Sequence, residues 1–400
     1  MSHSFHHCIQ FGLSLHILYQ FIDQEDYQMK SFIEKVKTIV SGNVRTDSIK
    51  AEHLNESLNQ IKSTGSLVKK PMVSKFLRLL LSHRSERSVL DQPGDFVPYG
   101  VGNRKRLATC SGVSWFDDHH LAAVNLYGQH ARIYQILYAD AHRFEPKRLQ
   151  LIHQHTEDIN FPEDISISAN HSYAAITNTL NSTQGVSIFK MDAVSFHFTH
   201  LISRICTEHT CHGIQFSPDS KHIVFTIISP PGSVEVYAVS DLDVQHTFSL
   251  ENPDPQHRPK AACFTKDSKY IAILYSLAAG PSFNLQINKS KICIHPYSSE
   301  KGEIGHPIIA EYIHQTESNC AFEIGAFQWL AARQVYSLYI TDQEDKIFKF
   351  IFDPQSLKIG LEGFYDQDIP FPHGVDISPD GHYMAVTTLG DDSIKIFELI

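Results

Sequence analysis

One ten-residue segment occurs twice in this chain of 400 residues. The first copy, residues 211–220, reads Cys-His-Gly-Ile-Gln-Phe-Ser-Pro-Asp-Ser, and the second, residues 372–381, reads Pro-His-Gly-Val-Asp-Ile-Ser-Pro-Asp-Gly. Each copy alternates apolar and polar residues, reaches a Ser-Pro-Asp turn and continues into a second alternating stretch, which is the pattern of a β-hairpin. Copies that lie far apart in one chain indicate a repeat architecture.

Four weaker copies lie before and between the two strong ones. With all six aligned, the first strands begin at about residues 112, 164, 213, 261, 326 and 374, so their spacings are 52, 49, 48, 65 and 48 residues. A third strand follows each hairpin. Several short strands per unit at a period of about 40–50 residues predict an all-β propeller. We expect six blades, and a seventh is possible if residues 85–106 contribute one.

The last copy offers only three strands, of which the third is residues 393–399. The outer edge of this strand needs a partner, because an unpaired strand edge promotes aggregation. We expect residues 104–109 to pair with 393–399 and close the ring. The predicted organisation is therefore a helical N-terminal region over residues 1–95 and a propeller over 96–400.

The strongest copy carries a family resemblance. The segment Phe371–Gly381, together with Asp391–Phe397, resembles the repeat of YVTN-type and lactonase-like β-propellers. It is more distantly similar to the WD40 repeat, whose Gly-His and Trp-Asp dipeptides are missing here. The resemblance covers residues 107–400 and implies a propeller fold. Such superfamilies include lactone hydrolases, redox-cofactor enzymes and binding scaffolds, so the resemblance implies no single chemistry.

Residues 1–95 carry apolar residues at helical spacing and predict three helices. The third follows Pro71 and is basic, since residues 61–87 contain seven Lys and Arg against one Glu. Its cations Lys69, Lys70, Lys75 and Arg78 could bind a protein partner or, through residues 69–87, an anionic membrane. The preferred interpretation is that this helix docks on the propeller, because residues 96–400 carry a net charge of −12.

Composition narrows the location and the partners. The seven cysteines have no paired or metal-type spacing, which predicts a reducing, cytoplasmic environment. The N-terminus lacks the features of a signal peptide, and no segment reaches the length of a transmembrane helix. Because the ring is acidic, we do not expect nucleic acid as a partner.

The first strands of a propeller surround a central channel, and ligands usually bind at its mouth. By register, the residues that begin these strands are Ser111, Glu163, His212, Lys260, Gly325 and His373. Imidazole, carboxylate and ammonium groups that converge there could bind a small ligand, hold a divalent metal or act as acid and base. The simpler alternative is that they are polar residues of a solvated rim. No metal or other cofactor is assigned from the sequence, although a divalent metal at the mouth is possible.

Two functions follow from this pattern. The preferred one is a non-catalytic binding or scaffold propeller that uses one face for a protein partner or a small ligand. The alternative is a lactonase-like hydrolase of a sugar lactone, in which His212, His373 and Glu163 would activate water and Lys260 would hold the substrate. The chain lacks a Gly-x-Ser-x-Gly elbow, a P-loop, a His-Glu-x-x-His motif and a Cys-x-x-Cys motif, which favours the first function.

Overall fold

The computed structural model describes residues 76–84, 110–126, 128–140, 143–179, 185–205, 209–241, 243–252, 257–277, 289–315, 322–342 and 345–400. They form β-strands and connecting turns, and all belong to one compact unit, Pro71–Ile400. Within these ranges, no helix has the length and apolar character needed to cross a membrane.

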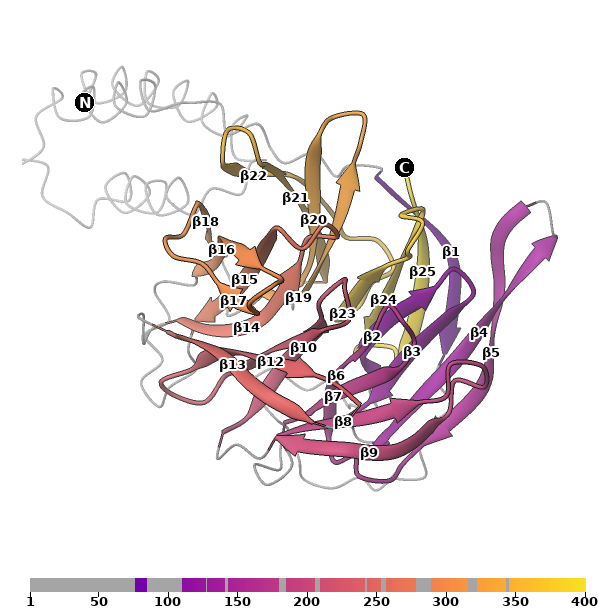
Figure 1. The fold of residues 1–400 in the computed structure, drawn as a ribbon. Helices are drawn as coiled ribbons and strands as arrows, with labels where there is room; N and C mark the ends of the chain where they lie inside the picture. The colour runs from indigo at the N-terminus through magenta and orange to yellow at the C-terminus, as the bar shows by residue number, and fades with distance from the viewer. Residues whose placement is uncertain are drawn as a thin grey trace, which may run out of the picture. The chain divides into compact units, whose positions relative to one another are not determined.

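Six antiparallel sheets radiate from a common centre as the blades of a propeller (Figure 1). The first three blades are β2 (Cys110–Asp117), β3 (His120–Asn125), β4 (His130–Asp140) and β5 (Arg143–His155); β6 (Pro162–Ile167), β7 (Tyr173–Asn178), β8 (Val186–Met191) and β9 (Phe198–Ile205); and β10 (Cys211–Phe216), β11 (His222–Ile227), β12 (Ser233–Val239) and β13 (Val244–Glu251). The other three are β14 (His257–Phe264), β15 (Tyr270–Leu277), β16 (Lys289–Ser298) and β18 (Ala310–Gln315), with β17 (Glu303–Ile304) also paired to β16; β19 (Phe322–Leu330), β20 (Val335–Asp342), β21 (Lys346–Asp353) and β22 (Lys358–Tyr365); and β23 (Pro372–Ile377), β24 (Tyr383–Thr388), β25 (Ser393–Leu399) and β1 (Leu77–Arg84).

The first strand of every blade lies innermost. Neighbouring first strands contact one another in the closed order β2, β6, β10, β14, β19, β23 and back to β2. The prediction of an all-β propeller with six blades is therefore confirmed for the part of the chain that the structure describes.

Four of the described turns between first and second strands share one hydrogen-bond pattern, in which a Ser or Thr hydroxyl donates to the Asp or Asn two residues later. The Ser217 hydroxyl donates to the Asp219 carboxylate at 2.6 Å, and the backbone N–H of Ser217 donates to the carbonyl of His222. Ser378 and Asp380 repeat the contact at 2.5 Å in the last blade. Both aspartates therefore cap their own hairpin turns, because each carboxylate accepts hydrogen bonds within its turn.

Apolar side chains of adjoining blades pack against each other and form the core. Large side chains such as Phe189, Phe225 and Phe350 are fully buried between sheets. The four described cysteines, Cys110, Cys211, Cys263 and Cys293, are buried free thiols. Free thiols at such positions pack as small apolar groups.

The ring is closed by β1, not by the predicted segment. β1 pairs antiparallel with β25, from Leu77 opposite Leu399 to Arg84 opposite Ser393. The other edge of β25 pairs with β24. The predicted pairing of residues 104–109 with 393–399 is wrong, because both edges of β25 are occupied. Residues 104–109 themselves lie outside the described ranges.

The same strand corrects the helix predicted after Pro71. Residues 77–84 were assigned to a basic amphipathic helix, but they form β1 and belong to the propeller. The free backbone groups of β25 outweigh the local helical pattern, since pairing satisfies them. Arg78 lies on this outermost strand, where its exposed guanidinium contacts Glu398 at 2.5 Å. Lys69, Lys70, Lys75 and the remaining predicted helices lie outside the described residues.

Candidate functional site

Each first strand contains a β-bulge near its beginning. The pairing register with the second strand shifts between Cys110 and Val113, Pro162 and Asp164, Cys211 and Ile214, Pro259 and Ala261, Phe322 and Gly325, and Pro372 and Val375. A bulge turns the side chain of the extra residue away from the ordinary alternation. The residues within the six bulges include Ser111, Glu163, His212, Lys260, Glu323 and His373, which we call the inner ring.

Five of the six inner-ring residues match the sequence prediction, and the sixth does not. Gly325 was expected to represent the fifth blade, but Glu323 occupies that place. The fifth repeat has lost the Pro and Asp of its turn. Without these two residues, the alignment of this repeat with the others was two residues off at the start of the strand. A signal for Glu323 was present in the order of residues. Glu323 directly follows Phe322, the first residue of its strand, just as His212 directly follows Cys211, the first residue of another first strand.

Glycines allow the first strands to approach closely at the inner ring. A Cβ atom at Gly374 would lie 2.6 Å from the carbonyl oxygen of Ser111, and one at Gly213 would lie 2.8 Å from Cα of Ala261. Backbone contacts this short exclude a side chain. The glycine after each histidine of the two strong repeats is therefore required by packing between blades.

Threonine hydroxyls fix the backbone under the inner ring. Each comes from the second strand of one blade and donates to the carbonyl of an inner-ring residue in the next blade. The four pairs are Thr177 with His212, Thr226 with Lys260, Thr341 with His373, and Thr387 with Ser111. The inner-ring side chains therefore project from a backbone held by neighbouring blades.

Four inner-ring side chains meet through their polar ends. Nε2 of His212 lies 3.2 Å from Oε1 of Glu163 and 3.2 Å from Oε2 of Glu323. Nε2 of His373 lies 3.0 Å and 3.4 Å from the same two oxygens. The ammonium of Lys260 lies 2.8 Å from Oε2 of Glu323. We call Glu163, His212, Glu323 and His373 the His–Glu cluster.

The opposite nitrogen of each imidazole is held by the protein. Nδ1 of His212 lies 3.0 Å from the carbonyl oxygen of Lys260, and Nδ1 of His373 lies 3.4 Å from the Ser111 hydroxyl. Because a carbonyl oxygen only accepts hydrogen bonds, Nδ1 of His212 carries a proton. Both rings are thus oriented with Nε2 toward the carboxylates.

The His–Glu cluster is buried and strongly charged. The side chains of His212 and His373 are 3% exposed and that of Glu323 is 1% exposed. Burial raises the pKa of Glu163, but hydrogen bonds from His212 and His373 outweigh this effect and hold it well below its usual range. Burial lowers the pKa of His373, but its bonds to Glu163 and Glu323 raise it to about 10. Burial likewise opposes the charge of Glu323, whose pKa is lowered by Lys260 and the two histidines.

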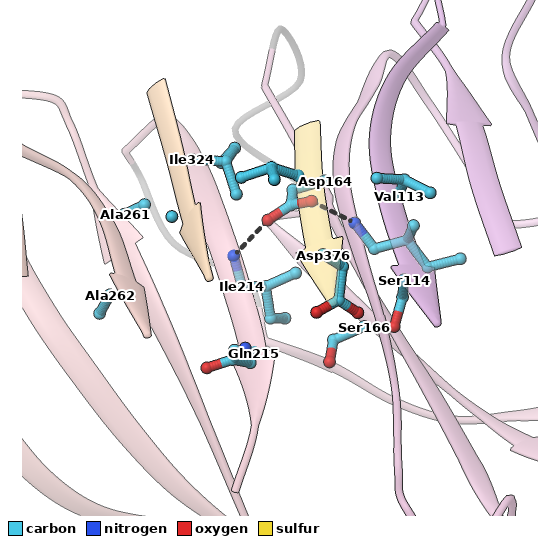
Figure 2. Close-up of a pocket in the computed structure, with 13 residues that line it drawn as sticks. Val113, Ser114, Asp164, Ser166, Ile214, Gln215, Ala261, Ala262, Ile324 and Asp376 are labelled. Atoms are coloured by element: carbon cyan, nitrogen blue, oxygen red, sulfur yellow. Dashed lines mark hydrogen bonds between the residues drawn. The ribbon is translucent and has the colours of Figure 1, made fainter. Parts of the chain in front are cut away.

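A second level of buried acids lines a cavity further along the channel (Figure 2). Asp164 accepts the backbone N–H of Ile214 at 3.0 Å, and Asp376 accepts that of Trp115 at 2.8 Å. Each bond crosses to the next blade. Burial raises the pKa of both carboxyls to about 7. Sequence reasoning missed these two residues as site candidates, because their partners are backbone groups of the next blade.

The geometry permits three kinds of chemistry at the inner ring. Imidazole nitrogens and carboxylate oxygens that converge can bind a metal ion, carboxylate–imidazole pairs can transfer protons, and Lys260 can attract an anion. Glu163, His212 and His373 offer ligand atoms that all lie within 4.8 Å of one another. The structure thus brings together Ser111, Glu163, His212, Lys260 and His373 as predicted, with Glu323 added. Arg78 lies apart from them on β1.

Comparisons with known proteins identify a fold and not a family. No model of a known protein family matches this chain. No curated protein matches its sequence. The resemblance to the YVTN-type repeat therefore stays a prediction.

Several solved structures resemble the propeller. A periplasmic gluconolactonase of Pseudomonas aeruginosa is 16% identical, with 72% of this chain and 80% of that chain covered and a TM-score of 0.51. An auxiliary nutrient binding protein of Bacteroides thetaiotaomicron is 14% identical over 72% of this chain and 69% of that one, with a TM-score of 0.49. Hydrazine synthase of Kuenenia stuttgartiensis is 12% identical over 76% and 80%, also at 0.49. At such identities the likeness to the gluconolactonase shows the propeller fold alone.

Proposed function

We propose that the protein is a non-catalytic binding propeller that holds a small polar ligand at the inner ring. One observation carries the proposal: four ionisable side chains from four different blades converge within hydrogen-bond distance in a buried place. Burying charge is costly, and apolar residues of similar volume would close a channel at least as stably. The fold therefore keeps these groups for a purpose other than stability.

Exposure favours binding over catalysis. The imidazoles that would act as acid and base are 3% exposed. Only Lys260, at 17%, and Glu163, at 11%, reach appreciably toward solvent. A catalytic base must come within hydrogen-bond reach of the proton that it removes, which the buried imidazoles do not offer to a bulky substrate.

Native mass spectrometry tests the binding proposal. The full chain, purified without tag or chelator, should carry a stoichiometric extra mass that is lost from a His212→Gln/His373→Gln variant. His295→Gln is the matched control, because His295 is likewise a buried histidine whose Nδ1 faces a backbone carbonyl, but it lies outside the inner ring. A bare mass for the wild type, together with no mass gain in a crude cell extract, would overturn the proposal.

The alternative function is hydrolysis of a sugar lactone. It is favoured by the carboxylate–imidazole pairs, which are suited to general acid–base catalysis, and a protein of similar fold is described as a gluconolactonase. A pH-stat assay with gluconolactone separates the two functions. We expect the spontaneous rate only; a faster rate that Glu163→Gln abolishes in a folded protein would replace the binding proposal with the hydrolase.

A further inference from the structure

In the part of the chain that the structure describes, three buried histidines hold Nδ1 against a backbone carbonyl. They are His130, His212 and His295, at 3.0, 3.0 and 3.1 Å. Among the described residues, Nε2 of His130 and Nε2 of His295 have no hydrogen-bond partner. Nε2 of His212 instead has two carboxylate oxygens, each at 3.2 Å. His212 is thus distinguished by what its second nitrogen faces.

The tautomer of His212 makes this arrangement informative. Since Nδ1 donates to the Lys260 carbonyl, the neutral ring turns the lone pair of Nε2 toward two negative oxygens. That contact is repulsive unless a positive charge, either a second proton on the ring or a metal ion, lies between the three atoms. Imidazoles that ligate metals are held in the same way, with one nitrogen donating to a carbonyl and the other directed at the ion.

The contacts between the imidazoles and the carboxylates have the lengths expected between ligands of one ion: Glu163, His212 and His373 offer atoms within 4.8 Å of one another, and Glu323 adjoins both imidazoles. The four nitrogen–oxygen separations run from 3.0 to 3.4 Å. Four ligands placed tetrahedrally at about 2.0–2.1 Å from zinc are separated from one another by about 3.3 Å. A proton on either Nε2 can make one linear hydrogen bond to one carboxylate oxygen, whereas a central ion would contact both nitrogens and both oxygens at once.

The charge and the ligand types select a class of ion. With both imidazoles neutral, as metal ligands must be, the two carboxylates and the Lys260 ammonium carry one net negative charge, which favours a cation at their centre. Calcium and magnesium take oxygen ligands, whereas two imidazole nitrogens with carboxylate oxygens suit zinc and its first-row neighbours. Among these, zinc binds nitrogen and oxygen ligands more tightly than manganese or iron.

We infer that Glu163, His212, Glu323 and His373 bind one divalent transition-metal ion of the class to which Zn²⁺ belongs, on the axis of the propeller. This inference rests on the proposed function and names the ligand of the same site. The ion is held by residues of four blades, and its second-nearest partners are the Lys260 carbonyl and the Ser111 hydroxyl, which orient the imidazoles.

Titration of the full, EDTA-treated chain with Zn²⁺ alone tests the inference. We expect one ion per chain with a dissociation constant below about 1 μM, and no binding of Ca²⁺ at the same concentration. Glu163→Gln and His212→Gln should each weaken zinc binding by at least about tenfold, since each removes a ligand. His295→Gln is the matched control, because it alters a buried histidine with the same Nδ1 contact but no carboxylate, and should leave zinc affinity unchanged.

X-ray absorption of the zinc-loaded wild type keeps the test decisive if a variant fails to fold. Two imidazoles per zinc are expected in the first coordination shell. No stoichiometric binding, fewer than two imidazoles, or unchanged affinity in folded Glu163→Gln would overturn the inference.

The native mass spectra distinguish failure of the metal inference from failure of the proposed binding function. An organic mass that depends on the two histidines, with no zinc binding, overturns the metal inference and keeps the binding function. No mass and no zinc overturn both. Zinc binding together with lactone hydrolysis keeps the metal site and overturns the non-catalytic assignment.

Discussion

Buried carboxyls at the centre of this propeller divide into two kinds by their partners. Glu163 and Glu323 face imidazoles and an ammonium, which lower their pKa values despite burial. Asp164 and Asp376 are equally buried but face backbone amides, and their pKa values rise to about 7. Neutral amide donors compensate burial less than charged partners do, so the pKa values of Glu163 and Asp164, adjacent residues of one strand, shift in opposite directions.

The raised pKa of Asp376 predicts a pH-dependent stability. The folded pKa of about 7 exceeds that of an unfolded aspartate, so the contribution of this group is complete below pH 4 and is lost as pH rises through 7. At about 1.4 kcal/mol per pKa unit, the loss between pH 4 and pH 8 is at most about 4 kcal/mol. In urea unfolding across this range, the free energy of unfolding of the wild type should fall relative to that of Asp376→Asn as pH rises, because the neutral amide does not ionise. Parallel curves would contradict the prediction.

Close approach between blades predicts a cost for a single methyl group. Gly374→Ala would place Cβ 2.6 Å from the Ser111 carbonyl oxygen and should lower the free energy of unfolding by about 1–3 kcal/mol. Gly360→Ala is the control, because its Cβ meets no atom within 4 Å. Chemical denaturation measures both. An equal effect of the two substitutions would show that crowding at Gly374 is absent.

Among the elements, strands inside strong repeats were predictable and isolated ones were not. The third strands over residues 233–239 and 393–399 were predicted with the bounds that β12 and β25 have, because a clear hairpin precedes each. β1 has no repeat around it, and its run of leucines fits a helix as well as a strand. Only pairing with a strand more than 300 residues away decides between them.

The residues of the candidate site likewise divide into those that a repeat made predictable and those that it did not. Five inner-ring residues were predictable because the bulge falls at a constant distance from a recognisable turn. Glu323 was missed where that turn has degenerated, and Asp164 and Asp376 were missed because their partners are backbone groups of the next blade. Contacts between blades leave no pattern within a single repeat.

The pairing of β1 predicts unequal effects for two neighbouring substitutions. Leu77 is 5% exposed opposite Leu399, so Leu77→Ala should reduce the free energy of unfolding by about 2–3 kcal/mol. The side chain of Arg78 is 61% exposed, so Arg78→Ala, which removes only a surface ion pair, should cost less than about 1 kcal/mol. Thermal unfolding distinguishes them. A larger loss of stability in Arg78→Ala than in Leu77→Ala would show that the charges of β1, and not its apolar contacts, stabilise the pairing.

At the scale of the whole propeller, hydrogen bonds from side chains to backbone join one blade to the next. Strand residues of one blade accept backbone N–H groups of its neighbour: Ser114 from Ile167, Ser166 from Phe216, Gln215 from Phe264, Asp164 from Ile214 and Asp376 from Trp115. The last pair links the sixth blade to the first. The ring is therefore closed at its centre as well as at β1.

This arrangement predicts that the chain tolerates a new pair of ends. The N–H of Ile400 donates to the carbonyl of Phe76 at 3.0 Å, so in a variant without residues 1–75 a short turn can join these two residues and make β25 and β1 an ordinary hairpin. A permuted chain opened between residues 95 and 96 should keep the sheet content and unfolding midpoint of the parent. One opened at Asn170, inside the turn of a first hairpin, should unfold more easily. Circular dichroism with thermal melts compares them, and equal loss in both would contradict the prediction.

The position of β1 also determines how the ring would respond to a mechanical load. Phe76 and Ile400 lie at the same end of the β1–β25 ladder, so tension applied between them would break its hydrogen bonds one after another, as in a zip. Such peeling needs less force than sliding two strands past each other, which breaks all their bonds together. Because β1 is outermost and β23 innermost in that blade, tension would strip the rim and leave His373 and its charged neighbours assembled.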